Sequence, residues 1–110
     1  MAVDFIRQVT GISITVEPHM GEDIAPVIDE IVSVVLARAK GYNIPYELKK
    51  YEFEDFIICD VYQFDLYLEF WYLSDPDEFI YALEEVLYEY DCTPRDSNVY
   101  EWDVEDTGRG

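Results

Sequence analysis

The sequence predicts an α+β fold, a single-domain two-layer sandwich in which two helices cover one face of an antiparallel sheet. Half of the 110 residues are hydrophobic and 16% are aromatic, which is enough apolar material for one buried core. Two segments have helical periodicity with strongly apolar faces, and other segments alternate apolar and polar residues as strands do. Their order along the chain reads β-α-β-β-α-β.

The first strand is predicted at residues 12–17, where β-branched residues alternate with polar ones. Residues 3–10 permit either a short helix or the lead into this strand. Pro18 and Gly21 are expected to end the strand.

The first helix is predicted at residues 22–40, because apolar residues recur there at helical spacing. Glu22 and Asp23 at its start favour the helix dipole, and basic residues stand at its end. Pro26 fits only within the first turn, and Gly41 is expected to cap the C-terminus.

A hairpin is predicted next, with strands at about residues 48–59 and 63–73 and a turn near Asp60. Side chains of a strand point alternately to its two faces. The apolar residues at positions 64, 66, 68 and 70 therefore share one face. On the other face we expect Asp65, Tyr67, Glu69 and Trp71, beside Glu52 and Glu54 of the first hairpin strand.

The second helix is predicted from Pro76 to about Tyr90, with Ser74 or Asp75 as its N-cap and acidic residues in its first turn. Its apolar residues recur at helical spacing and form a second core-facing stripe.

Residues 91–98 are expected to form a loop, and residues 99–104 alternate and predict the last strand. We therefore expect one acidic domain over residues 1–104 and a flexible tail at 105–110. The order β-α-β-β-α-β is that of the split βαβ, or ferredoxin-like, sandwich. In that fold one sheet face stays open to solvent or to a partner, and the fold itself does not decide the function.

The charge is the strongest functional signal. There are 25 Asp and Glu residues against seven Lys and Arg, a formal net charge of −18. Acidic residues run along the whole chain among aromatic ones, so the charge must lie on a folded surface, where it repels itself. Nucleic acid and anionic membranes would repel this protein, so we expect a basic protein partner. The N-terminus has no secretory pattern, which predicts a cytoplasmic location.

No catalytic, metal or cofactor motif is visible. His19 is the only histidine and is expected to be an exposed loop residue. Cys59 and Cys92 are expected to be reduced thiols, and a zinc site would need more ligands. Asp75 and Asp77 resemble the start of a calcium loop, but helix capping explains them better. We therefore predict a non-enzymatic protein without cofactor.

The partner-binding surface is predicted from the spacing of carboxylates. Residues i and i+2 on a strand project about 6.6 Å apart, similar to successive phosphates of a nucleic acid, which rise about 3.4 Å along a helical path. Interleaved Tyr and Trp would add anchoring. The predicted binding residues are Glu52, Glu54, Asp65, Tyr67, Glu69 and Trp71 on the sheet, with Glu84, Glu85, Tyr88 and Glu89 on the second helix as the alternative face.

In size, charge and aromatic content the chain resembles phage-encoded acidic inhibitors of host defence, such as DNA-mimicking anti-restriction and anti-CRISPR proteins. The resemblance implies an inhibitor that acts in the host cytoplasm on a basic nuclease or defence complex. Three alternatives remain: an immunity protein that neutralises a nuclease toxin, a highly acidic domain without any mimicry role, and an enzyme without a recognised motif. The aromatic residues of the open sheet face would also fit a second core layer, covered by the N-terminal segment or by a homodimer partner.

Overall fold

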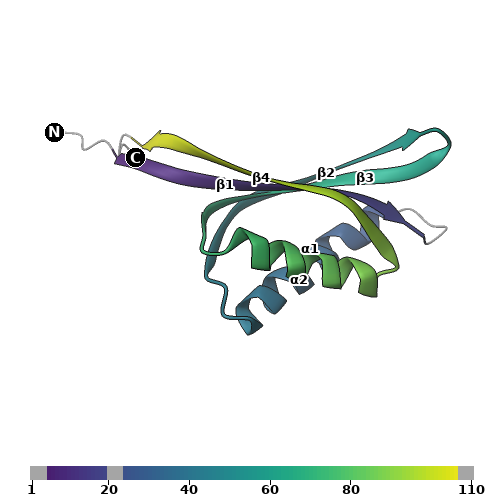
Figure 1. Ribbon diagram of the computed structural model, residues 1–110, viewed down its shortest axis with the longest axis horizontal. Coiled ribbons are helices and arrows are strands. Elements are labelled where there is room, and N and C mark those ends of the chain that lie inside the picture. The colour runs from purple at the N-terminus through teal and green to yellow at the C-terminus, as the bar shows by residue number, and fades with distance from the viewer. Residues whose placement is uncertain (1–4, 20–23, 107–110) are drawn as a thin grey trace.

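The computed structural model describes residues 5–19 and 24–106. A four-stranded sheet forms one layer and two helices form the other, which cover a single face of the sheet (Figure 1). The elements are β1 (Phe5–Pro18), α1 (Ala25–Gly41), β2 (Tyr46–Ile58), β3 (Val61–Leu73), α2 (Pro76–Glu89) and β4 (Cys92–Asp106).

The strands lie in the order β2-β3-β1-β4, and every neighbouring pair is antiparallel. The two central strands, β1 and β3, are therefore separated in the chain by α1 and β2. This is the arrangement of the ferredoxin-like sandwich, so the predicted fold class and element order are confirmed.

The β2–β3 hairpin turns where the sequence predicted. Ile58 pairs with Val61, so Cys59 and Asp60 form a two-residue turn. Both residues have left-handed backbone conformation, with φ of 51° and 63°. Two successive positive φ values are typical of the type I′ turn, whose twist matches that of the strands.

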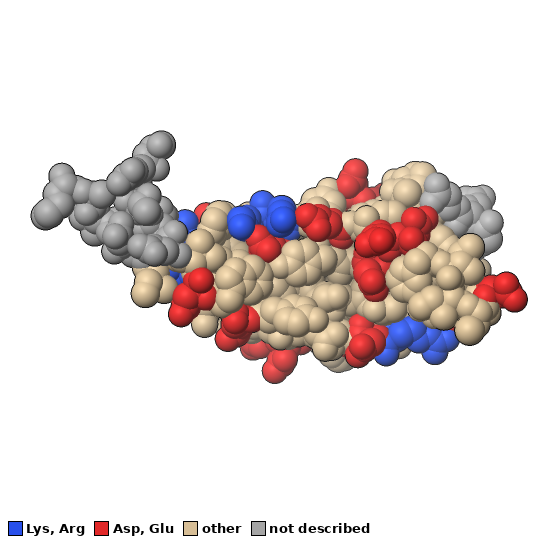
Figure 2. Space-filling view, turned by 90° about the horizontal axis from the view of Figure 1, so that it is seen from above, with Lys and Arg blue, Asp and Glu red and all other residues tan. Residues whose placement is uncertain are grey.

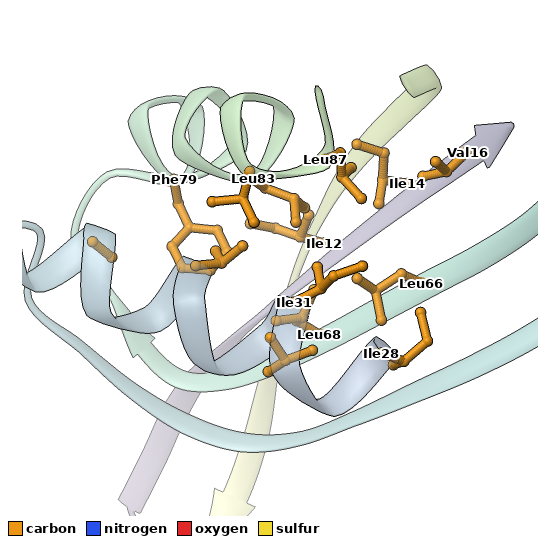
Figure 3. Close-up of a cluster of buried hydrophobic side chains, with 14 of the residues drawn as sticks. Ile12, Ile14, Val16, Ile28, Ile31, Leu66, Leu68, Phe79, Leu83 and Leu87 are labelled. Atoms are coloured by element: carbon orange, nitrogen blue, oxygen red, sulfur yellow. The ribbon is translucent and has the colours of Figure 1, made fainter. Parts of the chain in front are cut away.

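The core lies between the sheet and the helices (Figure 3). On the two central strands the even-numbered side chains point into it: Ile12, Ile14 and Val16 oppose Leu68, Leu66 and Phe64. All six are at most 1% exposed. Because the even-numbered residues of β3 are buried, its predicted alternation is confirmed. The helices contribute core side chains such as Ile31 and Leu83.

The helix ends differ in part from expectation. α1 begins at Ala25 and has no acidic residue in its first turn; Glu22 and Asp23 lie outside the described residues. Gly41 is the last helical residue rather than the cap. The left-handed conformation falls on Asn43 (φ 58°), and the N–H of the following residue donates to the carbonyl of Ala39 at 2.9 Å.

The second helix begins as predicted. Asp75 is its N-cap, and its Oδ1 accepts the N–H of Glu78 at 3.2 Å. Pro76 opens the helix, and acidic residues occupy the first turn, where they complement the helix dipole.

The β1 and β4 strands are longer than the sequence suggested. Residues 5–10 belong to β1, so the described part of the ambiguous segment 3–10 is a strand, and residues 3 and 4 lie outside the described residues. The predicted loop at 91–98 is wrong, because β4 begins at Cys92. Pro94 is accommodated beside a register shift on this edge strand, where a missing N–H costs little. β4 continues to Asp106, two residues into the predicted tail, because β1 provides its partner.

Long strands give the molecule an elongated shape, with extents of 56 × 31 × 22 Å. The β1–β4 pair projects beyond the helices at one end, and the β2–β3 hairpin projects at the other (Figure 1).

Candidate partner-binding face

The sheet face opposite the helices is formed by the odd-numbered residues of β1 and β3, whose even-numbered side chains enter the core. The register carries this face across the sheet, from Glu52 and Glu54 on β2 to Tyr100 and Trp102 on β4. We call it the open face. Figure 2 views the molecule from this side, and acidic side chains border an uncharged central strip.

One end of the open face carries a row of carboxylates. Glu54 pairs with Asp65, Asp65 with Thr15, and Thr15 with Asp96, so all four residues lie in one line across the sheet. The Thr15 hydroxyl donates to Asp65 Oδ1 at 2.7 Å. We call Glu54, Asp65 and Asp96 the acidic row. Glu52 stands in the next line, opposite Tyr67.

The other end of the open face is aromatic. Trp102 pairs with Val9 and Tyr100 pairs with Gly11. Val9 is fully buried although it lies outside the main core. A Cβ on Gly11 would lie 2.7 Å from the Tyr67 hydroxyl and 3.1 Å from the Trp102 ring, so only glycine admits this packing. Val9, Gly11, Tyr67 and Trp102 therefore form a small second core layer within one chain, with Tyr100 and part of the Trp102 ring at its surface.

Glu69 is buried at the junction of the two ends. It is 6% exposed, and its carboxylate contacts Lys49 Nζ at 2.7 Å and accepts the Tyr67 hydroxyl at 2.7 Å. Lys49, and after it Tyr67, hold the pKa of Glu69 below its ordinary value, although burial opposes them. Burial first, and then the hydrogen bond to Glu69, raise the pKa of Tyr67. Glu69, predicted to bind a partner, is thus satisfied within the chain.

Trp71 is also engaged by its own chain. The Arg7 guanidinium carbon and Lys49 Nζ each lie 4.6 Å from its ring centroid, within cation–π range. A partner that contacts this ring would therefore meet two cations of this chain. The exposed aromatics of the open face are instead Tyr100 and Trp102, 49% and 37% exposed.

The alternative face on α2 is partly engaged by its own chain. Arg38 contacts Glu89 through both terminal nitrogens of its guanidinium group, one of them at 3.0 Å. The same group lies 3.6 Å from Glu85. The Tyr42 hydroxyl donates to Glu85 at 2.7 Å. The Arg38 hydrogen bond lowers the pKa of Glu89. Tyr88 stays 61% exposed, but two of the three predicted carboxylates on this helix already have partners.

The other cations of the described chain are similarly occupied. Arg7 pairs with Glu47 at 3.9 Å, Lys50 with Glu52 at 3.1 Å, and Arg95 with Glu17. The remaining cation, Lys40, lies 5.9 Å from the centre of the Tyr46 ring. Among the residues with described side chains, no Lys or Arg forms an ion pair with a member of the acidic row.

Groups that commonly serve catalysis are scattered. His19 is exposed, as predicted, and its Nε2 lies 2.6 Å from Thr93 Oγ1. Cys59 is exposed in the hairpin turn and Cys92 is buried at the start of β4, both as free thiols. Burial raises the pKa of the Cys92 thiol to about 11. Within residues 5–19 and 24–106 no cluster of His, Cys, Asp and Glu has the arrangement of a metal site, and neither described helix is long and apolar enough to cross a membrane.

The sequence missed three residues of the open face: Asp96, Tyr100 and Trp102. Tyr100 and Trp102 stand at alternate positions of the predicted last strand, so the sequence predicts that they lie on the same face of that strand. Only the pairing of β4 with β1 shows that this face is the open face of the sheet. Asp96 was missed because residues 91–98 were expected to form a loop.

No protein-family model matches the sequence, and a comparison with curated proteins finds no match. Solved structures share the fold at low similarity. One is LarC2, the C-terminal domain of a cyclometallase involved in the synthesis of the NPN cofactor of lactate racemase, with 12% identity and a TM-score of 0.49. This chain is covered over 91% of its length and spans 58% of that chain.

Two further similar structures are a formyltetrahydrofolate deformylase from Pseudomonas putida KT2440 and a dimeric protein of unknown function and ferredoxin-like fold from Bacteroides fragilis NCTC 9343. The first shows 15% identity and a TM-score of 0.46, over 82% of this chain and 28% of that one. The second shows 16% identity and a TM-score of 0.40, over 88% of this chain and 96% of that one.

Proposed function

We propose that this protein is a non-enzymatic inhibitor that occupies the nucleic-acid site of a basic protein, with the acidic row and Glu52 in the place of phosphates. The proposal assigns the partner to the class of nucleases and defence complexes and places the inhibitor in the cytoplasm. Free thiols at Cys59 and Cys92 agree with a reducing compartment.

The observation that carries the proposal is the direct opposition of Glu54 and Asp65. Like charges at opposed positions of a sheet destabilise it. Lys50 compensates Glu52, but in the described structure no cation pairs with Glu54, Asp65 or Asp96. A surface that keeps this uncompensated repulsion is well suited to receive cations from another molecule.

The spacing of these carboxylates suits a partner that binds phosphates. Neighbouring strands lie roughly 5 Å apart, and residues i and i+2, such as Glu52 and Glu54, roughly 6.6 Å apart. A basic groove that accepts successive phosphates would therefore meet carboxylates at comparable intervals. Tyr100 and Trp102, on the same face, offer exposed aromatic surface of the kind that anchors interfaces.

The experiment uses the chain as bait for proteins from a cell lysate treated to remove nucleic acids. Bound proteins are then challenged with a DNA duplex and an RNA duplex at constant ionic strength, and those that elute are identified. Two variants with equal change of charge accompany the parent. They are a sheet triple, Glu52→Gln, Glu54→Gln and Asp65→Asn, and a helix triple, Glu84→Gln, Glu85→Gln and Glu89→Gln.

Mimicry predicts that the duplex elutes a nucleic-acid-binding protein, that the sheet triple loses this capture, and that the helix triple retains it. Asn at position 65 keeps an acceptor for the Thr15 hydroxyl, so the sheet triple is expected to fold. Equal loss in both triples would mean that net charge alone attracts the partner. A captured nuclease that stays bound while its nucleic-acid groove is occupied would point to the immunity-type alternative instead.

A further inference from the structure

The sheet has two edge strands, β2 and β4, which differ in the regularity of their pairing and in their side chains. An edge strand presents unpaired backbone N–H and C=O groups, to which another chain can add a strand. Residues 95–103 of β4 are exposed along their whole length. In the described part of the chain the outer side of β4 has no strand beside it.

The first part of the β2 edge, residues 47–50, carries features that discourage strand addition. Its pairing with β3 shifts register between Glu47 and Leu48 and again between Leu48 and Lys50. Lys49 and Lys50 stand at this irregularity, and bulges and lysines both discourage edge-to-edge pairing.

The β4 edge is regular instead. Its pairing with β1 shifts register at one place, between Thr15 and Val16, beside Pro94. From Asp96 to Asp106 the pairing continues without interruption. An edge whose pairing is uninterrupted over this length offers the backbone groups that β-augmentation uses.

The side chains of this edge divide into two chemical classes. Tyr100 and Trp102 lie on the open face, and Glu101 and Asp103, at the intervening positions, point to the other side. All four are exposed. A strand added here would therefore meet aromatic rings on one of its faces and carboxylates on the other.

We propose that β4 accepts an extended segment of the partner as a fifth strand, and that this segment alternates basic and apolar residues. The basic side chains would contact Glu101 and Asp103, and the apolar ones would pack on Tyr100 and Trp102. The inference rests on the proposed function for the basic character of the partner. A second copy of this chain is a poor occupant, because it would bring its own Glu101 and Asp103 to the same edge.

The probe is a blocked ten-residue peptide of five Lys-Val repeats. Its control is the same peptide N-methylated at four consecutive central residues, which keeps charge and side chains but loses amide donors on both of its edges. Binding to the ¹⁵N-labelled protein is followed by amide chemical shifts and by hydrogen exchange. We expect slowed exchange at the outward amides within residues 96–104, and at least about tenfold weaker binding of the N-methylated peptide, because about two hydrogen bonds to β4 are lost.

Two matched double variants locate the site. Glu101→Gln with Asp103→Asn should weaken peptide binding several-fold, whereas Glu52→Gln with Glu54→Gln should not. Equal binding of both peptides, or a dependence on Glu52 and Glu54, would overturn the fifth-strand proposal, since binding would then be electrostatic alone. Protection of the β4 edge in the free protein, together with a dimer in sedimentation, would overturn it in favour of a second copy. None of these outcomes bears on displacement by nucleic acid, so the proposed function fails or survives separately.

Discussion

Glu54 and Asp65 face each other across the β2–β3 pair, and the Thr15 hydroxyl on β1 holds the second carboxylate in place. The hydrogen bond fixes the direction of Asp65 without neutralising it. Two like charges are thereby kept at opposed positions of a sheet, which destabilises the fold and keeps both carboxylates available to an incoming cation.

Replacing Glu54 by Gln should therefore make the protein more stable. We expect a gain of about 0.2–1 kcal/mol in the free energy of unfolding, because the repulsion from Asp65 disappears. Urea denaturation at low ionic strength measures the change.

Glu101→Gln is the matched control, since it removes the same charge from an exposed residue that pairs with Thr10 rather than with an acid. A gain as large at Glu101 as at Glu54 would show that net charge matters and that the opposed pair does not.

A second prediction concerns the ion pair between the buried Glu69 and the exposed Lys49. Glu69→Gln should cost about 1–3 kcal/mol, because it removes charged hydrogen bonds to Lys49 and Tyr67. Lys49→Met should cost about 3 kcal/mol, because it leaves a buried carboxylate without its cation.

The double variant tests whether the two residues act as a pair. We expect it to be at least about 1 kcal/mol more stable than the sum of the single losses implies. Additive losses, measured by chemical denaturation, would mean that Glu69 contributes independently of Lys49.

The same carboxylate should give the protein a distinct dependence on pH. The pKa of Glu69 is lowered in the folded state, so its stabilisation is fully present above the ordinary glutamate pKa and is lost as pH falls through the folded value. The difference in stability between the parent and Glu69→Gln should therefore be constant near neutral pH and shrink on acidification. A difference that stays constant below pH 4 would contradict the lowered pKa. Comparing the two chains cancels the other acidic groups, which titrate in both.

Gly11 offers a test of the second core layer. Gly11→Ala should destabilise the protein by about 1–3 kcal/mol, because the new Cβ overlaps the Tyr67 side chain and crowds Trp102. The loss should be smaller in a Tyr67→Ala background, where the nearest overlapping atoms are gone. Thermal unfolding gives the stabilities. An equal loss in both backgrounds would assign the effect to the β1 backbone instead.

The sequence predicted the parts of this structure that depend on local pattern. Alternation along β3 identified both its core face and its open face, and Asp75 with Pro76 marked the start of α2. The same reasoning brought Glu52, Glu54 and Asp65 together, because strand periodicity and one hairpin turn are enough to align them.

What the sequence could not predict depends on pairing between distant segments. Gly11 makes room for Tyr67. Pro94, which lies in the segment predicted as a loop, is tolerated beside a register shift on an edge strand. The burial of Glu69 and the cations around Trp71 require Lys49 and Arg7 from two other strands. Residue types alone carried no information about these contacts.

The pairing of β1 with β4 has a consequence for how the chain assembles. Phe5 lies opposite Asp106, so the central strand receives its last neighbour from the far end of the chain. During synthesis one side of β1 stays unpaired until residues 92–106 have been made, and such exposed strands promote aggregation of nascent chains. Acidic residues run along the whole chain, so unfinished chains also repel one another. The acidity therefore protects the protein during its own production, before any partner is met.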